Sequence, residues 1–123
     1  MVITQMEKEL PKCGLSDPVG EAKRRAEKLG FSICPVVNEG GIVLGLVREE
    51  HWKGDSAVPV HKIMESGPTT LRPSYSAEAA TEFLMENDWD AVLVTSSDGK
   101  LMGVFKRQGA EEKRQLPKSE IWA

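Results

Sequence analysis

Two stretches of the chain repeat their apolar residues at the spacing of a helix that buries one face. The apolar positions are Val19, Ala22, Ala26 and Leu29 in the first stretch and Ala77, Ala80, Phe83 and Leu84 in the second. The first helix is expected to have Asp17 as its N-cap, Pro18 as its first residue and Gly30 as its terminator. Ser76 is the expected N-cap of the second helix.

Two apolar runs follow each predicted helix, and a tight turn separates the two runs of each pair. The runs are residues 33–37 and 42–47 in the first half of the chain and residues 91–94 and 101–105 in the second. The turns contain Gly40-Gly41 and Asp98-Gly99, which supply the positive φ angles that tight hairpins need. A short strand opens each half and a brief helix closes it, with strands near 12–13 and 69–71 and helices at 48–53 and 107–114. Each half is therefore predicted to have the order β-α-β-β-α.

The two halves are copies of one pattern. A shift of 58 residues aligns the chain with itself without a gap. The identical pairs are Val2/Val60, Met6/Met64, Glu7/Glu65, Ser16/Ser74, Ala22/Ala80, Val36/Val94, Gly41/Gly99 and Gly45/Gly103. The predicted division is residues 1–58 for the first repeat, 59–116 for the second and 117–123 for a tail. One repeat is too small for a good core, so the two are expected to pack face to face about a pseudo-twofold axis.

Composition and charge narrow the classes of function. The 123 residues are 40% hydrophobic and 28% charged, which is typical of one compact globular module. No apolar run approaches the roughly 20 residues that cross a bilayer, and the N-terminus lacks a signal-peptide pattern, so a cytoplasmic protein without membrane contact is predicted. The net charge of −3 argues against nucleic acid as a partner.

Reactive side chains give no catalytic pattern. Cys13 and Cys34 lack metal-ligand spacing and are predicted to be reduced, buried thiols, with a disulfide between them as the open alternative. His51 and His61 have no ligand spacing either, and locally hydrogen-bonded or surface imidazoles are favoured over a metal pair. No nucleophile, paired carboxylates or cofactor motif stands out. The protein is predicted not to be an enzyme; a small enzyme or metal protein using these four residues is the hypothesis from another class.

Residues 60–73 are the most specific stretch of the chain. They contain a valine, an Ile-Met pair, a turn, the short strand Thr69–Leu71 and a proline, and they resemble the segment between two cystathionine-β-synthase (CBS) domains. The similarity continues through residues 91–94, 98–99 and 101–104, and the first half matches at 17–19, 34–37 and 45–47. The resemblance implies an α+β fold, a tandem CBS pair, and a regulatory module rather than a catalyst. It also implies a homodimer.

Tandem CBS pairs are similar to one another in that they bind adenosine-containing ligands, in two clefts between the repeats. Carried over residue by residue, the resemblance implies two composite sites. The first consists of Met6, Pro11, Phe31 and Ser32 with Val104, Lys106 and Gly109. The second consists of Met64, Thr69, Trp89 and Asp90 with Leu46, Arg48 and His51. The second is chemically richer, because Trp89 can stack on a base and Asp90 can accept a hydrogen bond from an amine.

The chain departs from the family's nucleotide pattern in both halves. His51 and Gly109 stand where the pattern has the aspartate that accepts from the ribose hydroxyls, so adenine-nucleotide binding is expected to be weak. Arg48 and Lys106 replace the hydroxyl residue that contacts phosphate, and either cation could face an anion.

Two readings of the resemblance remain open. The first is a CBS pair that binds a small adenosine-type or anionic ligand, such as an adenine nucleotide or S-adenosylmethionine, and signals to an unknown regulated protein. No other cofactor is expected. The alternative is a degenerate pair that serves as a ligand-free dimerisation or scaffold module. Trp52 is expected either to anchor a contact between modules or to cover its own core, and Ile121 and Trp122 either dock or stay free.

Overall fold

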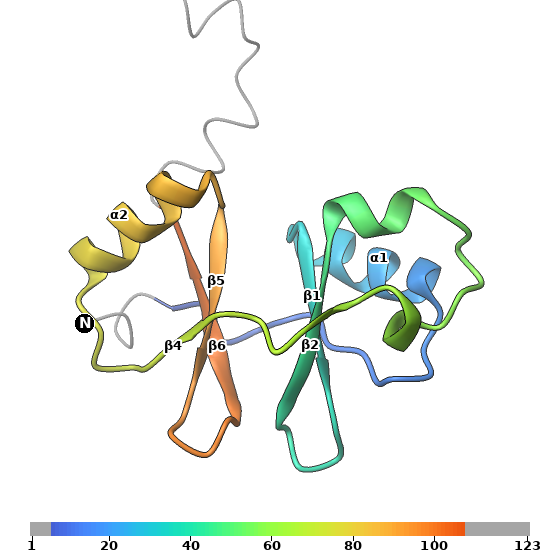
Figure 1. Ribbon diagram of the computed structural model, residues 1–123, viewed down its shortest axis with the longest axis horizontal. Helices are drawn as coiled ribbons and strands as arrows, with labels where there is room; N and C mark the ends of the chain where they lie inside the picture. The colour runs from blue at the N-terminus through green and yellow to red at the C-terminus, as the bar shows by residue number, and fades with distance from the viewer. Residues whose placement is uncertain (1–5, 108–123) are drawn as a thin grey trace, which may run out of the picture.

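The computed structural model describes residues 6–107, which form two three-stranded sheets with one α-helix against each (Figure 1). The elements in chain order are α1 (Val19–Lys28), β1 (Ile33–Val37), β2 (Val43–Arg48), the 3₁₀ helices η2 (Glu49–Lys53) and η3 (Val60–Lys62), β3 (Glu65–Ser66), β4 (Thr70–Leu71), α2 (Ala77–Asn87), β5 (Ala91–Thr95) and β6 (Leu101–Lys106). The sheets have the orders β1-β2-β3 and β4-β5-β6. They stand side by side in the centre of the molecule, and α1 and α2 cover the outer sides (Figure 1).

Both predicted α-helices are present, but one cap differs. The Ser76 hydroxyl caps α2 by accepting from the Ala79 N–H at 3.2 Å, as predicted. The prediction that Asp17 caps α1 is wrong: its carboxylate accepts from the Gly14 N–H at 2.8 Å and from Arg25 at 3.1 Å. Pro18 is the N-cap residue of α1 instead of its first residue. Carbonyl groups of residues 56 and 58 accept from the first N–H groups of α1, at 2.9 and 2.8 Å, so the chain itself replaces the side-chain cap.

The predicted hairpins β1–β2 and β5–β6 are confirmed, whereas the opening strands differ. Residues 70–71 form β4, parallel to β5, while Cys13 makes a single parallel bridge to Val36. The sequence analysis missed β3, which comes from the second repeat yet pairs antiparallel with β2 of the first. Glu7 of the first repeat bridges in the same way to Val104 of β6. Each repeat therefore contributes its leading segment to the sheet of the other.

The backbone pairings follow the 58-residue offset, which establishes the pseudo-twofold relation. The equivalent pairs are Glu7–Val104 with Glu65–Leu46, Cys13–Val36 with Leu71–Val94, and Val43–Gly99 with Leu101–Gly41. In the last pair, both N–H···O distances are 3.0 Å. The closing helix of the first repeat is the 3₁₀ helix η2. The helix predicted at 107–114 lies outside the described residues, apart from Arg107, as does the tail with Ile121 and Trp122.

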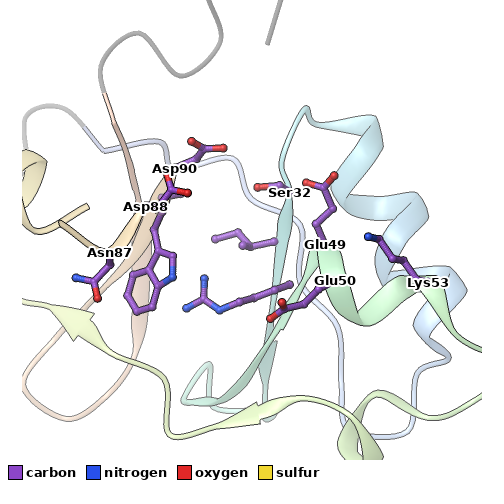
Figure 2. Close-up of a pocket in the computed structure, with 11 residues that line it drawn as sticks. Ser32, Glu49, Glu50, Lys53, Asn87, Asp88 and Asp90 are labelled. Atoms are coloured by element: carbon purple, nitrogen blue, oxygen red, sulfur yellow. The ribbon is translucent and has the colours of Figure 1, made fainter. Parts of the chain in front are cut away.

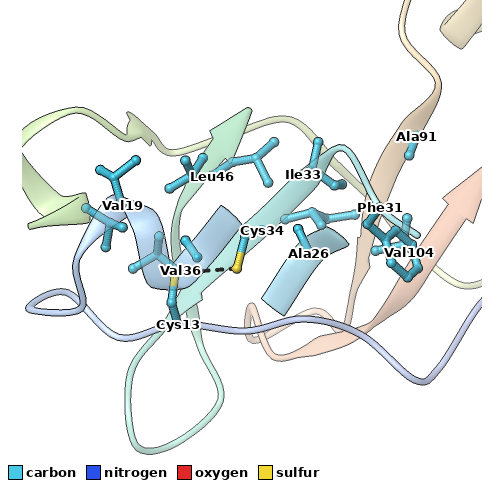
Figure 3. Packing of buried hydrophobic residues seen from close by; sticks show 14 residues of the cluster. Cys13, Val19, Ala26, Phe31, Ile33, Cys34, Val36, Leu46, Ala91 and Val104 are labelled. Carbon is cyan, nitrogen blue, oxygen red and sulfur yellow. Dashed lines mark hydrogen bonds between the residues drawn. The ribbon is translucent and has the colours of Figure 1, made fainter. Parts of the chain in front are cut away.

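The larger apolar cluster crosses the boundary between the repeats (Figure 3). Phe31 and Leu46 of the first repeat share it with Ala91, Leu93 and Val104 of the second. Alternate residues of β5 face the other way and pack with α2, as the two-residue period of a strand requires. Trp52 packs against the larger cluster and is half-buried, in agreement with the expectation that it covers its own core.

Cys13 and Cys34 are free thiols inside this cluster, 3% and 0% exposed, with their Sγ atoms 3.6 Å apart (Figure 3). The hydrogen bond that Cys34 donates to Cys13, together with burial, raises the pKa of Cys34. The same hydrogen bond lowers the pKa of Cys13, but burial keeps a reagent away from both sulfur atoms. We therefore expect both thiols to react with an aromatic disulfide reagent at pH 8 roughly 100-fold more slowly than free cysteine. Absorbance of the released thiolate measures the rate, and both thiols should react at once in guanidinium chloride. Rapid reaction of either thiol in the folded protein would contradict this.

The segments that the repeats exchange pack closely against two glycines, at positions where a side chain would not fit. A Cβ atom on Gly103 would lie 2.7 Å from the Glu7 carbonyl oxygen and 2.7 Å from the Met6 sulfur. Gly45 has the equivalent contact with Met64.

We expect Gly103→Ala to lower the free energy of unfolding by about 1–3 kcal/mol, because the Glu7 backbone must move. Urea denaturation measures the difference.

Gly54→Ala is the matched control for this substitution. A Cβ at Gly54 meets nothing within 4 Å, and its φ is −86°, so the change should stay within about 0.5 kcal/mol. Equal stability of the two variants would show that close approach of the exchanged segment does not support the fold.

Candidate ligand-binding site

A pocket of about 470 Å³ opens where β1 and β5 begin. Its lining consists of Ser32, Ile33, Arg48, Glu49, Glu50, Lys53, Asn87, Asp88, Trp89, Asp90 and Ala91. Ser32 and Ile33 are related to Asp90 and Ala91 by the 58-residue offset, so the pocket lies at the pseudo-twofold axis. Asn87, Asp88 and Asp90 approach it from one repeat, and Ser32, Glu49, Glu50 and Lys53 from the other (Figure 2). It is therefore a composite of both repeats.

The Trp89 ring is held between an aromatic neighbour and a cation. Phe83 of α2 contacts it edge to face, with ring centroids 5.7 Å apart and an interplanar angle of 76°. The guanidinium carbon of Arg48 lies 4.3 Å from the Trp89 ring centroid. An Arg48 nitrogen is also 3.3 Å from the Glu65 carboxylate, and the Arg48 side chain is only 15% exposed. Arg48 thus joins the end of β2 to β3 and to Trp89, which lies two residues before β5.

His51 is engaged locally. Its Nδ1 atom accepts from the Arg48 backbone N–H at 2.9 Å, which closes the first turn of η2. This agrees with the expectation of a locally bonded imidazole. Among residues 6–107, no group of three His, Cys, Asp or Glu side chains is arranged to hold a metal ion.

Carboxylates outnumber cations in the lining as described. Glu49, Glu50, Asp88 and Asp90 contribute four, against Arg48 and Lys53. Asp90 forms an ion pair with Arg107 at 3.3 Å, and its carbonyl accepts from the Arg107 N–H at 2.7 Å. Arg48 is paired with Glu65. The local field therefore favours a neutral or cationic group over a polyphosphate.

The structure places the residues of the two predicted sites in different surroundings. Of the second set, Trp89, Asp90 and Arg48 line the pocket, but Leu46 is buried in the core and Met64 packs against it. Thr69 is exposed, one residue before β4. His51 lies on η2 outside the lining.

In the first set, Ser32 lines the pocket. Phe31 is 5% exposed, and the Lys106 ammonium lies 4.1 Å from its ring centroid. Pro11 and Val104 are buried, and Met6 packs against the smaller cluster. Gly109 lies outside the described residues. Seven lining residues were not predicted from the sequence, although each lies within five residues of Ser32, Arg48 or Trp89: Ile33, Glu49, Glu50, Lys53, Asn87, Asp88 and Ala91.

The comparison with protein families agrees with this duplicated architecture. The sequence model of the CBS domain matches residues 2–51 and again residues 60–108. The chain belongs to the CBS-domain family. The resemblance found in the sequence is thus confirmed, and each match lies within a different copy of the 58-residue repeat.

Solved structures of CBS-domain proteins share this fold. CBSX2 in complex with AMP is 20% identical, with 99% of this chain and 98% of that chain covered and a TM-score of 0.77. The CBS domains of a transcriptional regulator from Streptococcus pneumoniae are 20% identical, covering 90% and 96%, with a TM-score of 0.76. The cytosolic domain of the Mg²⁺ channel MgtE in complex with ATP is 19% identical, covering 91% and 47%, with a TM-score of 0.75. Within the described residues, no helix has the length and apolar character to cross a membrane.

Proposed function

We propose that this CBS-domain protein is a non-catalytic regulatory module that binds a small adenosine-type ligand in the pocket between its repeats and signals to a partner protein. The observation that supports this most is the composite pocket with the Trp89 ring in its wall. CBSX2 and the MgtE domain, which have the same fold, are described with AMP and with ATP. The protein would act in the cytoplasm, as a homodimer built from the repeats at 1–58 and 59–116.

The pocket offers chemistry that suits a nucleoside. A volume of about 470 Å³ lies within the usual range of small-molecule sites. Trp89 provides an aromatic surface, and Ser32 and Asp90, one from each repeat, are polar residues of the lining, with Asp90 also paired to Arg107. Because the carboxylates disfavour phosphate, the adenosine part should contribute most of the affinity. Arg48 already has a carboxylate partner, which weakens the case for a purely anionic ligand.

A ligand-free scaffold is the second candidate function. It is favoured by the two cations that already cover the aromatic rings, Arg48 on Trp89 and Lys106 on Phe31. If the protein is a scaffold, these two contacts hold the repeats together and no ligand is needed to do so.

A thermal-shift series separates the two functions. We expect adenosine, AMP and S-adenosylmethionine, each at about 5 mM, to raise the melting temperature by a few degrees, because ligand bound only by the folded state stabilises it by mass action. ATP should have a smaller effect, and tripolyphosphate none, because the lining is acidic. Trp89→Leu is the control and should abolish the shifts.

Two results of this series would contradict adenosine binding. If no adenosine compound moves the melting temperature of the folded protein, the scaffold function replaces the ligand-binding one. A larger shift with tripolyphosphate than with adenosine would instead indicate an anion site at Arg48 or Lys106.

A further inference from the structure

Each aromatic residue that precedes β1 or β5 is covered by a cation from the other repeat. Arg48 at the end of β2 lies 4.3 Å from the Trp89 ring centroid, and Lys106 at the end of β6 lies 4.1 Å from that of Phe31. Both cations and both rings are related by the 58-residue offset. Both contacts therefore belong to the duplicated framework. The surroundings of the two contacts differ, and that difference indicates which of them a ligand can reach.

The Trp89 contact is the one that opens into the pocket. Phe31 is a core residue, 5% exposed, so its ring has little surface to offer a ligand. Trp89 and Arg48 both line the pocket, whereas neither Phe31 nor Lys106 belongs to its described lining. A planar ligand that enters the pocket and stacks on Trp89 must share that ring with the guanidinium or displace it.

Arg48 is fixed in this position by more than the ring. Its guanidinium pairs with Glu65 of the exchanged strand β3 at 3.3 Å, and its backbone N–H donates to His51 at 2.9 Å. A guanidinium is planar and stacks on aromatic rings as a nucleobase does. Arg48 thus already makes the stacking contact that an adenine ring would make.

We infer that Arg48 is the specificity-determining residue of the pocket, because its guanidinium lies over the Trp89 ring and a ligand ring that stacks there must displace it. This inference rests on the proposed function. Displacement moves Arg48 off Trp89 and away from the position in which Glu65 holds it at 3.3 Å, so binding costs the cation–π contact and weakens the ion pair. Ligands that stack weakly on Trp89 are excluded by this competition.

Calorimetric titration with adenosine tests the inference. Arg48→Met keeps an unbranched, flexible side chain but removes the planar charge, and it should bind adenosine about three- to tenfold more tightly than the original protein. Lys106→Met is the matched control at the equivalent position and should leave the affinity unchanged. Glu65→Gln, which weakens the hold on Arg48, should tighten binding by a smaller factor.

A second readout does not depend on ligand. In a protein with Trp52 and Trp122 replaced by Phe, the fluorescence of Trp89 should change on Arg48→Met and stay unchanged on Lys106→Met. This measurement reports directly whether Arg48 covers the ring in solution.

The titrations test the role of Arg48 separately from the proposed function. Equal or weaker adenosine binding by Arg48→Met and Glu65→Gln overturns the inference and leaves the proposed function standing, with Arg48 as a ligand contact or a bystander. Tighter binding by Arg48→Met than by the original protein, with Lys106→Met unchanged, supports the inference. No binding by any of the four proteins overturns the proposed function, and the inference with it.

Discussion

The exchange of backbone segments between the repeats is the constraint on which the rest of the structure depends. Glu65 and Ser66 complete the sheet of the first repeat, and Glu7 bridges to the sheet of the second. Buried backbone groups need partners, so neither sheet edge is satisfied by its own repeat alone. The exchanged segments also lie close against the sheets that they complete, because a methionine side chain lies where Gly45 and Gly103 have none. The core and the pocket both follow from this packing.

The symmetric framework carries a site that is not symmetric. The backbone pairings repeat at the 58-residue offset, whereas the side chains at the axis differ: Trp89 replaces Phe31, Asp90 replaces Ser32 and Arg48 replaces Lys106. Phe31 is absorbed into the core, and Trp89 borders open space. The duplicated backbone thus determines where the pocket lies, and the residues in which the two repeats differ determine its chemistry. Function is to be sought in those differences instead of the fold.

Local patterns predicted much of the fold, and contacts distant in sequence account for what they missed. The hairpins and the Ser76 cap depend on neighbouring residues, so period and turn composition were sufficient. The cap of α1 comes from carbonyl groups about 40 residues away, and β3 is too short to have a period. In the site, the family resemblance pointed to Arg48, Trp89 and Asp90, but it could not show that Glu65 would neutralise Arg48. The charged residues around them resemble any exposed turn in sequence.

The central claim is that an adenosine-type ligand binds between the repeats against Trp89. The most direct test is a titration with adenosine followed through the indole N–H signals in a nitrogen-15 NMR spectrum, assigned by single Trp→Phe substitutions. Trp89 lines the pocket, whereas Trp52 packs against the core outside its lining. The account predicts that the Trp89 signal moves and saturates with the affinity found by calorimetry while the Trp52 signal stays in place. A Trp89 signal that does not move at saturating adenosine, or a Trp52 signal that moves instead, would contradict it.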